Sequence, residues 1–319
     1  MSVRKGPFIA GWVVAPGLLA SLANAAITIP TAPIGNPGNA PDSLNFGTRL
    51  RGAVSYSYRI ATTEVTNVQY AAFLNAVAQS DPHGLYNFSM GADALGGILR
   101  FGTPGSYSYS VKDGRGNHPV AFVGLTDAVR FANWLHNGQP TGPSGPSTTE
   151  DGAYTMTPFT IYPVRNAGWS WAIPNIDEWH KAAYFQPATE GGDIDNYWRF
   201  PTSANTIDTS QANYGVPTGG DTRPVGSYAP NANGVFDMGG NIDELTETIG
   251  FGGVFAGAIA VGGAFNWSAD GLSAEFSGYL ALNEGPGFRV VQVPGPTTGL
   301  VLGVMGILAS RRRRNIGHA

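Results

Sequence analysis

Oxygen atoms suited to binding a hard cation are concentrated in one short segment, residues 237–244 of the 319-residue chain. Asp237 and Glu244 lie seven positions apart and flank the glycine pair Gly239 and Gly240. A glycine turn can direct backbone carbonyls inward, so that carbonyl and carboxylate oxygens together form the type of ligand set that Ca²⁺ prefers. The alternative is a turn capped by an Asp side chain, with both carboxylates in solvent. The spacing leaves both interpretations open.

Thiol chemistry is excluded, because the chain has no cysteine. Disulfides, thiolate metal sites, iron–sulfur clusters and cysteine nucleophiles all require that residue. The histidines do not replace it, since none are paired at the spacing of metal ligands, and we expect surface or turn positions for them. They are His83, His118, His136, His180 and His318.

The composition limits the class of protein. The net charge of -4 and the 13% of charged residues provide no basic surface for nucleic acid, so we expect no nucleic-acid partner. The chain has 45 glycines and 23 prolines, which predicts a turn-rich fold with short elements. Its length is sufficient for a substantial hydrophobic core in one large domain or two ordinary ones.

The N-terminus has the pattern of a secretory signal peptide. Arg4 and Lys5 precede an apolar run over residues 8–22, and small residues follow at 23–25. This order predicts a signal peptide over residues 1–25 and an exported mature chain. A membrane anchor is the weaker alternative, because the apolar run is short and contains a proline.

The C-terminal residues 294–319 combine a short proline motif, an apolar segment at 299–309 and the cluster Arg311 to Arg314. A helix of about 12 residues is about 18 Å long, too short for the roughly 30 Å hydrocarbon core. The three-part order resembles the PEP-CTERM sorting signal, with Gly295 in place of the usual glutamate. The resemblance implies an exosortase-type processing enzyme, transient contact with the inner membrane, and a final location at the cell surface or in the extracellular matrix.

Between these ends, local patterns predict the elements that position the chemistry. Residues 26–48 are rich in proline, glycine and asparagine and indicate a linker or an edge segment. Alternation over 54–60 predicts a strand, and the capping-box pair Thr66 and Gln69 predicts a helix over 67–78.

Two further helices and two extended segments follow. Thr126 is the expected cap of a helix that ends at Gly138, and Asn175 with Glu178 predicts a third helix that ends before Pro187. The best extended segments in the last third are 254–264 and 288–293. The expected fold class is therefore α+β, with a few short helices, short strands and much irregular structure.

Five ordered segments resemble the formylglycine-generating enzyme, or sulfatase-modifying factor, family. They are residues 63–74, 118–135, 173–183, 224–244 and 262–290, and their most characteristic parts are the Gly-Gly-Asn of 239–241, the Gly-Gly of 262–263 and the Gly-Phe-Arg-Val of 287–290. The resemblance implies a variant of the C-type lectin fold. We expect this domain over residues 49–293.

The resemblance also indicates what is missing. Active family members oxidise a substrate cysteine to formylglycine with copper held by two cysteines, whose expected positions here are Trp267 and Leu272. The serine expected after the glycine pair is Ala264. Copper(I) prefers thiolate ligands, so we expect neither copper nor this oxidation. Related sulfoxide synthases use iron held by histidines on a helical partner domain. We expect no such iron site here, because the histidines are not paired at ligand spacing and no helical partner domain precedes them.

Calcium is the cofactor that the resemblance leaves open. By the resemblance, the ligands of the family's first calcium site would be the Asp237 side chain, the carbonyls of Gly240 and Ile242, and the Glu244 carboxylate. A second implies Asn213, the Tyr214 carbonyl and Asp221, across a loop that is shortened here.

We therefore expect an exported binding or structural module that is inactive in copper-dependent oxidation. Its candidate ligand surface consists of Asn266, Trp267, Tyr279 and Asn283, whose rings and amides suit a polysaccharide or protein ligand. Ordinary loop packing is the alternative for these residues. The alternative function is a divergent enzyme with a cysteine-independent activity, for which the available acids and bases are His118, Asp270, Glu275 and Glu284.

Overall fold

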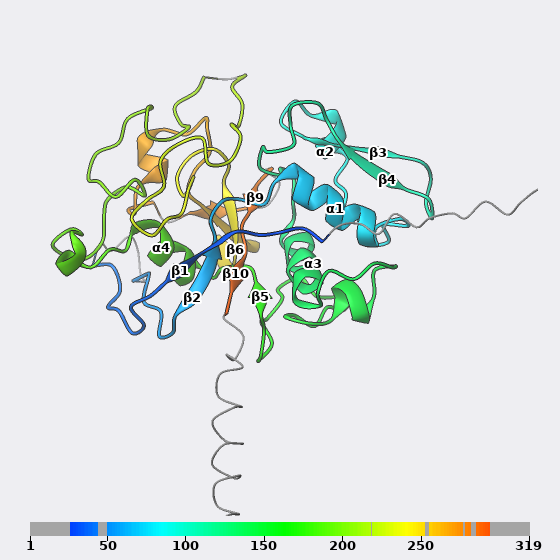
Figure 1. The fold of residues 1–319 in the computed structure, drawn as a ribbon, viewed down its shortest axis with the longest axis horizontal. Coiled ribbons are helices and arrows are strands. Elements are labelled where there is room, and N and C mark those ends of the chain that lie inside the picture. The colour runs from blue at the N-terminus through cyan, green and yellow to red at the C-terminus, as the bar shows by residue number, and fades with distance from the viewer. Residues whose placement is uncertain are drawn as a thin grey trace, which may run out of the picture.

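The computed structural model describes residues 26–43, 50–217, 219–252, 255–276, 278–281 and 285–293. The predicted signal peptide, the end of the 26–48 segment and the predicted sorting segment lie outside these ranges, as do Asn283 and Glu284. Helices and a hairpin from residues 67–136 occupy one side of the molecule, and the helix at 176–184 with long loops occupies the other (Figure 1). Within the described ranges, no helix has the length and apolar character required to cross a bilayer.

A four-stranded antiparallel sheet joins distant parts of the chain. Its order is β1 (Thr31–Ile34), β2 (Tyr58–Ala61), β10 (Val291–Gln292) and β5 (Trp171–Ala172). β10 lies between β2 and β5, so the last described strand completes the sheet that the first strands begin. The strand predicted over 54–60 is shorter and begins at Tyr58. β1 lies at the edge of this sheet.

Local capping determines where the helices begin. Helix α1 (Asn67–Val77) has the predicted capping box, in which the Thr66 side chain accepts a hydrogen bond from the Gln69 N–H. Helix α4 (Ile176–Tyr184) is confirmed in the same way, because Asn175 accepts from the N–H of Glu178 and Glu178 accepts in return.

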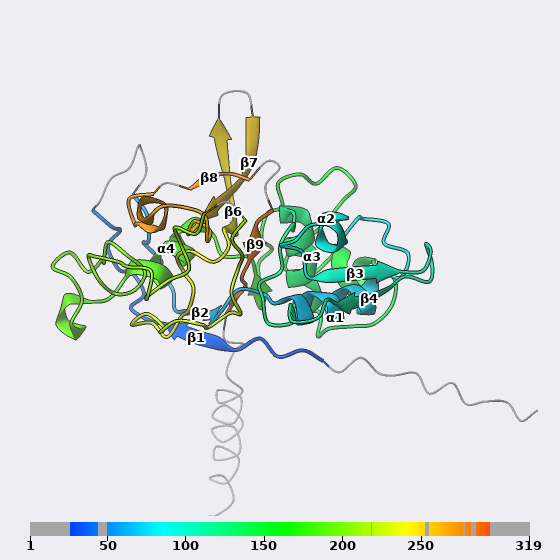
Figure 2. The ribbon, with the colours of Figure 1, turned by 90° about the horizontal axis from the view of Figure 1, so that it is seen from above.

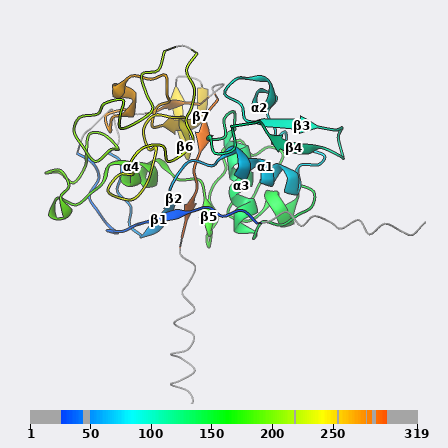
Figure 3. The ribbon, with the colours of Figure 1, turned by 45° about the horizontal axis from the view of Figure 1, so that its top comes forward.

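The predicted cap of helix α3 (Leu125–His136) is wrong. The helix begins before Thr126, and its N-cap is Gly124, whose N–H donates to the Asp127 carboxylate. The short helix α2 (Ser89–Ala92) and the hairpin of β3 (Ile98–Phe101) and β4 (Ser108–Val111) complete this side of the molecule, as Figure 3 shows.

A second four-stranded sheet has the order β8 (Tyr279–Leu280), β7 (Phe255–Val261), β6 (Glu244–Gly252) and β9 (Gly287–Phe288). The β6–β7 hairpin projects beyond the body of the molecule (Figure 2). The extended segments expected at 254–264 and 288–293 correspond to β7 and to β9 with β10, while the sequence patterns did not predict β6. Single turns of irregular helix lie at Pro146–Glu150, Ala188–Glu190 and Ala269–Leu272.

An aromatic core joins the helices to β9. Phe288 packs edge-on against Phe131 of α3 and Tyr70 of α1, with ring centroids 5.3 Å and 6.2 Å apart. Phe73 and Trp134 extend the cluster at 5.4 Å. The sequence around residue 288 is thus held in place by rings that come from the first half of the chain. The structure is the expected α+β fold of short helices, short strands and irregular loops.

Candidate functional site

The Glu244 carboxylate, at the start of β6, forms a buried ion pair. Arg289 Nε and Nη2 donate to its two oxygens at 2.6 Å and 2.5 Å, and Trp179 Nε1 donates at 2.8 Å. Arg289 also donates to the carbonyls of Ala61 and Phe236. Both oxygens of the carboxylate expected to bind calcium therefore have protein donors.

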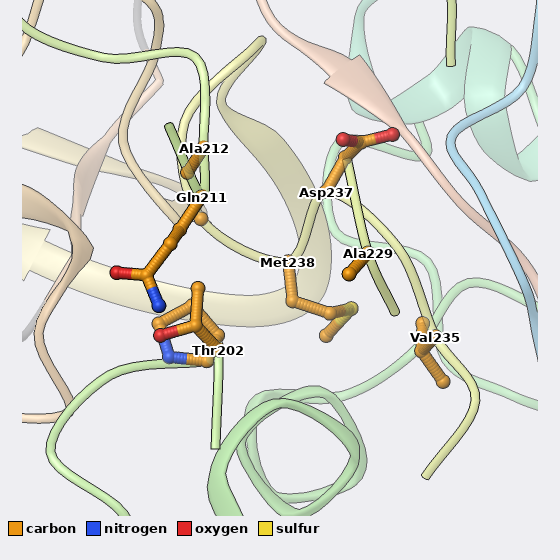
Figure 4. A pocket seen from close by; sticks show the side chains of 9 residues that line it. Thr202, Gln211, Ala212, Ala229, Val235, Asp237 and Met238 are labelled. Carbon is orange, nitrogen blue, oxygen red and sulfur yellow. The ribbon is translucent and has the colours of Figure 1, made fainter. Parts of the chain in front are cut away.

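Asp237 lies seven residues earlier, in a left-handed backbone conformation with φ of 54°. Its carboxylate accepts a hydrogen bond from the Gly226 N–H at 2.6 Å. Figure 4 shows this carboxylate and the Met238 side chain extending in different directions from neighbouring positions. Burial raises the pKa of Asp237, and burial together with the charge of Asp237 raises the pKa of Glu64.

A backbone hydrogen bond joins the segments that carry the two predicted calcium sites. The Asn241 N–H donates to the Asn213 carbonyl at 2.8 Å, and Gly240 has a φ of 82°. A Cβ at Gly240 would lie 2.3 Å from that carbonyl oxygen, so only glycine fits here. The Asp221 carboxylate instead pairs with Arg115 at 2.6 Å.

The side chains of two other residues in the predicted calcium sites pack or hydrogen-bond within the protein. The Ile242 side chain is buried next to Gly287, and the Tyr214 hydroxyl donates to the Ile207 carbonyl at 3.2 Å. Within the described part of the chain, no three or more His, Cys, Asp or Glu side chains form a group that could hold a metal ion. The Glu244 carboxylate, whose two oxygens both accept hydrogen bonds from Arg289 and Trp179, does not fit a cation in this arrangement, whereas the Asp221 carboxylate is paired with Arg115 and is 53% exposed. Calcium itself stays a prediction.

The glycine pair after β7 brings that strand close to α4. Gly262 and Gly263 have φ values of 88° and 67°, which favour glycine. A Cβ at Gly262 would lie 3.1 Å from the Trp179 ring, and one at Gly263 would lie 3.0 Å from the Gly271 carbonyl. The pair thereby positions residues 264–272 beside the helix.

The two positions where the family resemblance places copper-binding cysteines belong to one apolar cluster. Leu272 is fully buried with Phe200 and Ala212, and Trp267 packs against this cluster. The Leu272 carbonyl accepts a hydrogen bond from the Tyr184 hydroxyl at 3.0 Å. Neither side chain has an atom that could ligate copper.

A cavity of about 520 Å³ opens beside Trp267. One wall is formed by residues 265–268 and the other by Gly215, Val216, Pro217 and Gly219. The two walls are joined by backbone hydrogen bonds, from the Gly215 N–H to the Trp267 carbonyl and from the Val216 N–H to the Phe265 carbonyl. None of the lining side chains carries a formal charge.

Three of the four predicted ligand-surface residues are described, and the structure places them in this region. Asn266 and Trp267 line the cavity. Tyr279 stacks on Trp267 with ring centroids 5.5 Å apart and an interplanar angle of 20°, and Phe276 meets the same ring edge-on at 5.1 Å. Asn283 lies outside the described residues. Whether this surface binds a ligand stays a prediction.

The acids and bases available for the alternative enzymatic function lie in different surroundings. His118 Nδ1 lies 2.9 Å from the Thr222 hydroxyl, and burial lowers its pKa. Glu275 pairs with Arg199 at 3.4 Å, and Asp270 lies in the irregular turn Ala269–Leu272. No contact recorded among the described residues joins these three groups into one catalytic arrangement.

A buried network that the sequence patterns did not predict surrounds Arg165. Its guanidinium lies 2.9 Å from both Glu178 and Glu247, and it covers the Trp169 ring at 4.2 Å. The Tyr154 hydroxyl donates to Glu247 at 2.5 Å. These contacts anchor the loop 155–164 at both ends, and no local spacing in the sequence could have indicated them.

Comparisons with known proteins agree with this fold. A family model described as the sulfatase-modifying factor enzyme 1-like domain matches residues 47–292. The chain is 28% identical over 211 residues to the formylglycine-generating enzyme of Streptomyces coelicolor, an alignment that covers 59% of this chain and 56% of that enzyme. The chain therefore matches little more than half the length of this curated relative.

Two solved structures share the fold. CarF superposes with a TM-score of 0.52 at 21% identity, over 84% of this chain and 99% of its own. Treponema denticola variable protein 1 superposes with a TM-score of 0.54 at 18% identity, over 85% of this chain and 97% of its own. At these identities the likeness concerns the fold alone.

Proposed function

The chain belongs to the sulfatase-modifying factor enzyme 1-like family, and we propose that it is a member that is exported, acts as a binding module and does not perform copper-dependent cysteine oxidation. The observation that carries the proposal is the apolar cluster at the two positions where the family resemblance places copper-binding cysteines. Trp267 and Leu272 occupy them. The absence of any cysteine means that no other thiol can take over this role.

The cavity beside Trp267 supports a binding role. Its volume of about 520 Å³ lies within the range of ligand pockets in proteins. Tyr279 and Phe276 hold the indole ring in place, so a ligand that stacks on Trp267 does not have to order it. Asn266 and Ser268 supply neutral hydrogen-bonding groups at the same wall.

The chemistry of the wall favours an uncharged ligand. An anion or a cation in this cavity would lose hydration without meeting an opposite charge, which is costly. A neutral sugar instead offers an apolar face for the indole and hydroxyls for the amide and the serine. We therefore propose a neutral polysaccharide as the ligand, in keeping with the expected export and sorting of the chain to a cell surface or matrix.

Binding of neutral oligosaccharides to the purified chain tests this proposal. A panel of neutral and acidic oligosaccharides is titrated by calorimetry against wild type, Trp267→Ala and the control Phe101→Ala, which removes an aromatic side chain 54% exposed on β3. We expect at least one neutral member to bind wild type and the control equally, and Trp267→Ala about tenfold or more weakly. Equal binding by all three proteins, or binding of acidic members alone, would contradict the proposal.

A further inference from the structure

Both walls of the Trp267 cavity are connected through backbone hydrogen bonds to one residue, Asn241. Its N–H donates to the Asn213 carbonyl at 2.8 Å, two residues before the wall that begins at Gly215. Its carbonyl accepts a hydrogen bond from the Phe265 N–H at 3.1 Å, on the wall that carries Trp267. Asn241 therefore lies between the two chain segments that continue into the walls of the cavity.

The Asn241 side chain also holds both ends of the segment 213–223, which supplies the Gly215 wall. Its Oδ1 accepts hydrogen bonds from the Arg223 N–H at 2.8 Å and from Asn213 Nδ2 at 3.3 Å. Asn213 Nδ2 in turn donates to the Asp221 carbonyl at 3.1 Å, which brings the two ends of the segment together. One side chain thus contacts the chain before and after the residues that line the cavity.

Asn241 is itself held in the protein interior by Glu64. Its Nδ2 donates to Glu64 Oε1 at 2.9 Å, and the two residues are 2% and 1% exposed. The preceding Gly240 N–H donates to the Gly262 carbonyl at 3.0 Å, just before the Trp267 wall. Because both the oxygen and the nitrogen of the buried amide have hydrogen-bond partners, the side chain has one favourable orientation.

The backbone conformation at Asn241 allows its amide to be removed selectively. Asn241 has a φ of 63°, in the left-handed region that asparagine and glycine adopt most readily. A glycine at this position can therefore keep the backbone geometry, while it loses every hydrogen bond of the side chain. The variant Asn241→Gly thus measures what the amide does for the two walls.

We propose that Asn241 is a positioning residue of the ligand cavity, which holds the two walls at the separation that lets a neutral sugar ring stack on Trp267. The inference rests on the proposed function, and it extends that function to a residue that does not itself line the cavity. Walls that are held in place before a ligand arrives do not have to be ordered on binding. Loss of the Asn241 amide should therefore loosen the walls and weaken binding.

Hydrogen exchange of backbone amides tests the positioning without any ligand. The full-length wild type is compared with Asn241→Gly, and the reporters are the amides of Gly215 and Val216, which donate to carbonyls of the opposite wall. The reference is the Ala61 amide, which donates to the Val290 carbonyl far from the cavity walls in the sequence. We expect the reporter amides of Asn241→Gly to exchange about tenfold faster than in wild type, relative to the reference amide.

Two control variants separate positioning from a general loss of stability. Asn196 has a φ of 72° and its Oδ1 accepts a backbone hydrogen bond, so Asn196→Gly removes an amide from the same backbone conformation at a residue that does not line the cavity. Asn133 is 0% exposed and donates to the carbonyls of Thr149 and Tyr154, so Asn133→Ala removes a buried amide from helix α3. Both controls should leave the relative exchange of the reporter amides within about twofold of wild type.

A milder variant covers the case in which Asn241→Gly does not fold, which thermal unfolding would show. Asn213→Ala removes the link from the Asn241 amide to one end of the segment 213–223 and leaves Asn241 in place. It should show the same pattern with a smaller change, about threefold faster relative exchange at the reporter amides.

Calorimetry with cellohexaose and mannohexaose adds the binding measurement. We expect a probe that binds wild type to bind both controls equally, and to bind Asn241→Gly about tenfold or more weakly. Unchanged relative exchange in Asn241→Gly, equal gains in the controls, or equal binding by wild type and Asn241→Gly would overturn the inference. Failure of both probes to bind wild type would instead count against the proposed function, and the exchange result would still decide whether Asn241 holds the walls.

Discussion

Arg289 and Glu244 form a two-armed ion pair whose side chains are 0% and 1% exposed. The pair joins the start of β6 to the segment between β9 and β10, and through the Ala61 carbonyl it also reaches β2. One arginine thus connects the two four-stranded sheets through Glu244, the carboxylate that was predicted to bind calcium.

Removing the arginine should be strongly destabilising. Arg289→Met leaves the Glu244 carboxylate buried without its counter-charge, which costs about 3–5 kcal/mol in other proteins. Arg199→Met, which breaks the exposed pair with Glu275, should cost less than about 1 kcal/mol. Chemical denaturation of both variants gives the two free energies of unfolding. Similar losses for the two variants would show that the buried pair has no special importance.

Calcium should not stabilise the protein through this carboxylate, because a cation would have to displace Arg289. We expect the unfolding temperature to change by less than about 1 °C between millimolar calcium and excess chelator, since a ligand that binds only the folded state would raise it. Magnesium serves as the control for ionic strength. A calcium-specific rise that Asp237→Asn abolishes would contradict this expectation and support calcium binding at the predicted site.

The close contact at Gly240 gives a matched pair of glycine variants. Gly240 and Gly138 have nearly the same φ, 82° and 79°, but only Gly240 lies against a neighbouring backbone. Gly138→Ala should therefore cost only the left-handed conformation, about 1–2 kcal/mol. Gly240→Ala adds a 2.3 Å approach to the Asn213 carbonyl and should cost at least about 1 kcal/mol more. Equal losses in denaturant unfolding would mean that the Asn213 segment moves aside freely.

The stability of the protein should depend on pH through Asp127, at the start of helix α3. Burial raises the pKa of Asp127 from 3.8 to about 7. A group whose pKa is higher in the folded state stabilises that state below its unfolded pKa, and this contribution is lost as pH rises through the folded value. The unfolding temperature of wild type, measured relative to that of Asp127→Asn, should therefore decrease as the pH rises from about 4 to about 7. A constant difference over this range would contradict the raised pKa.

Local signals in the sequence were sufficient for two helix starts. The capping boxes of Thr66 with Gln69 and of Asn175 with Glu178 act over three residues, so they are visible without knowledge of the fold. The start of α3 was misplaced because Gly124 has no side chain to mark it as a cap, and Asp127 supplies the carboxylate instead.

Long-range relationships could not be predicted in this way. Glu244 and Arg289 are 45 residues apart, and Arg165 meets Glu247 across 82 residues. Strand β6 was missed because glycines at 250 and 252 interrupt its apolar pattern, and its extended form depends on pairing with β7. The residues of the candidate cavity were partly identified from their types, whereas its opposite wall at 215–217 and 219 became visible only in the fold.

Oxygen consumption by the purified chain is the most direct test of its proposed inactivity as an oxidase. The protein is supplied with copper and a thiol-containing peptide, and oxygen uptake is recorded against copper and peptide alone. With Trp267 and Leu272 in one apolar cluster and no cysteine in the chain, we expect no uptake above that control. Protein-dependent uptake that saturates with peptide concentration, together with conversion of the peptide cysteine to formylglycine, would contradict the assignment of this chain as a binding module.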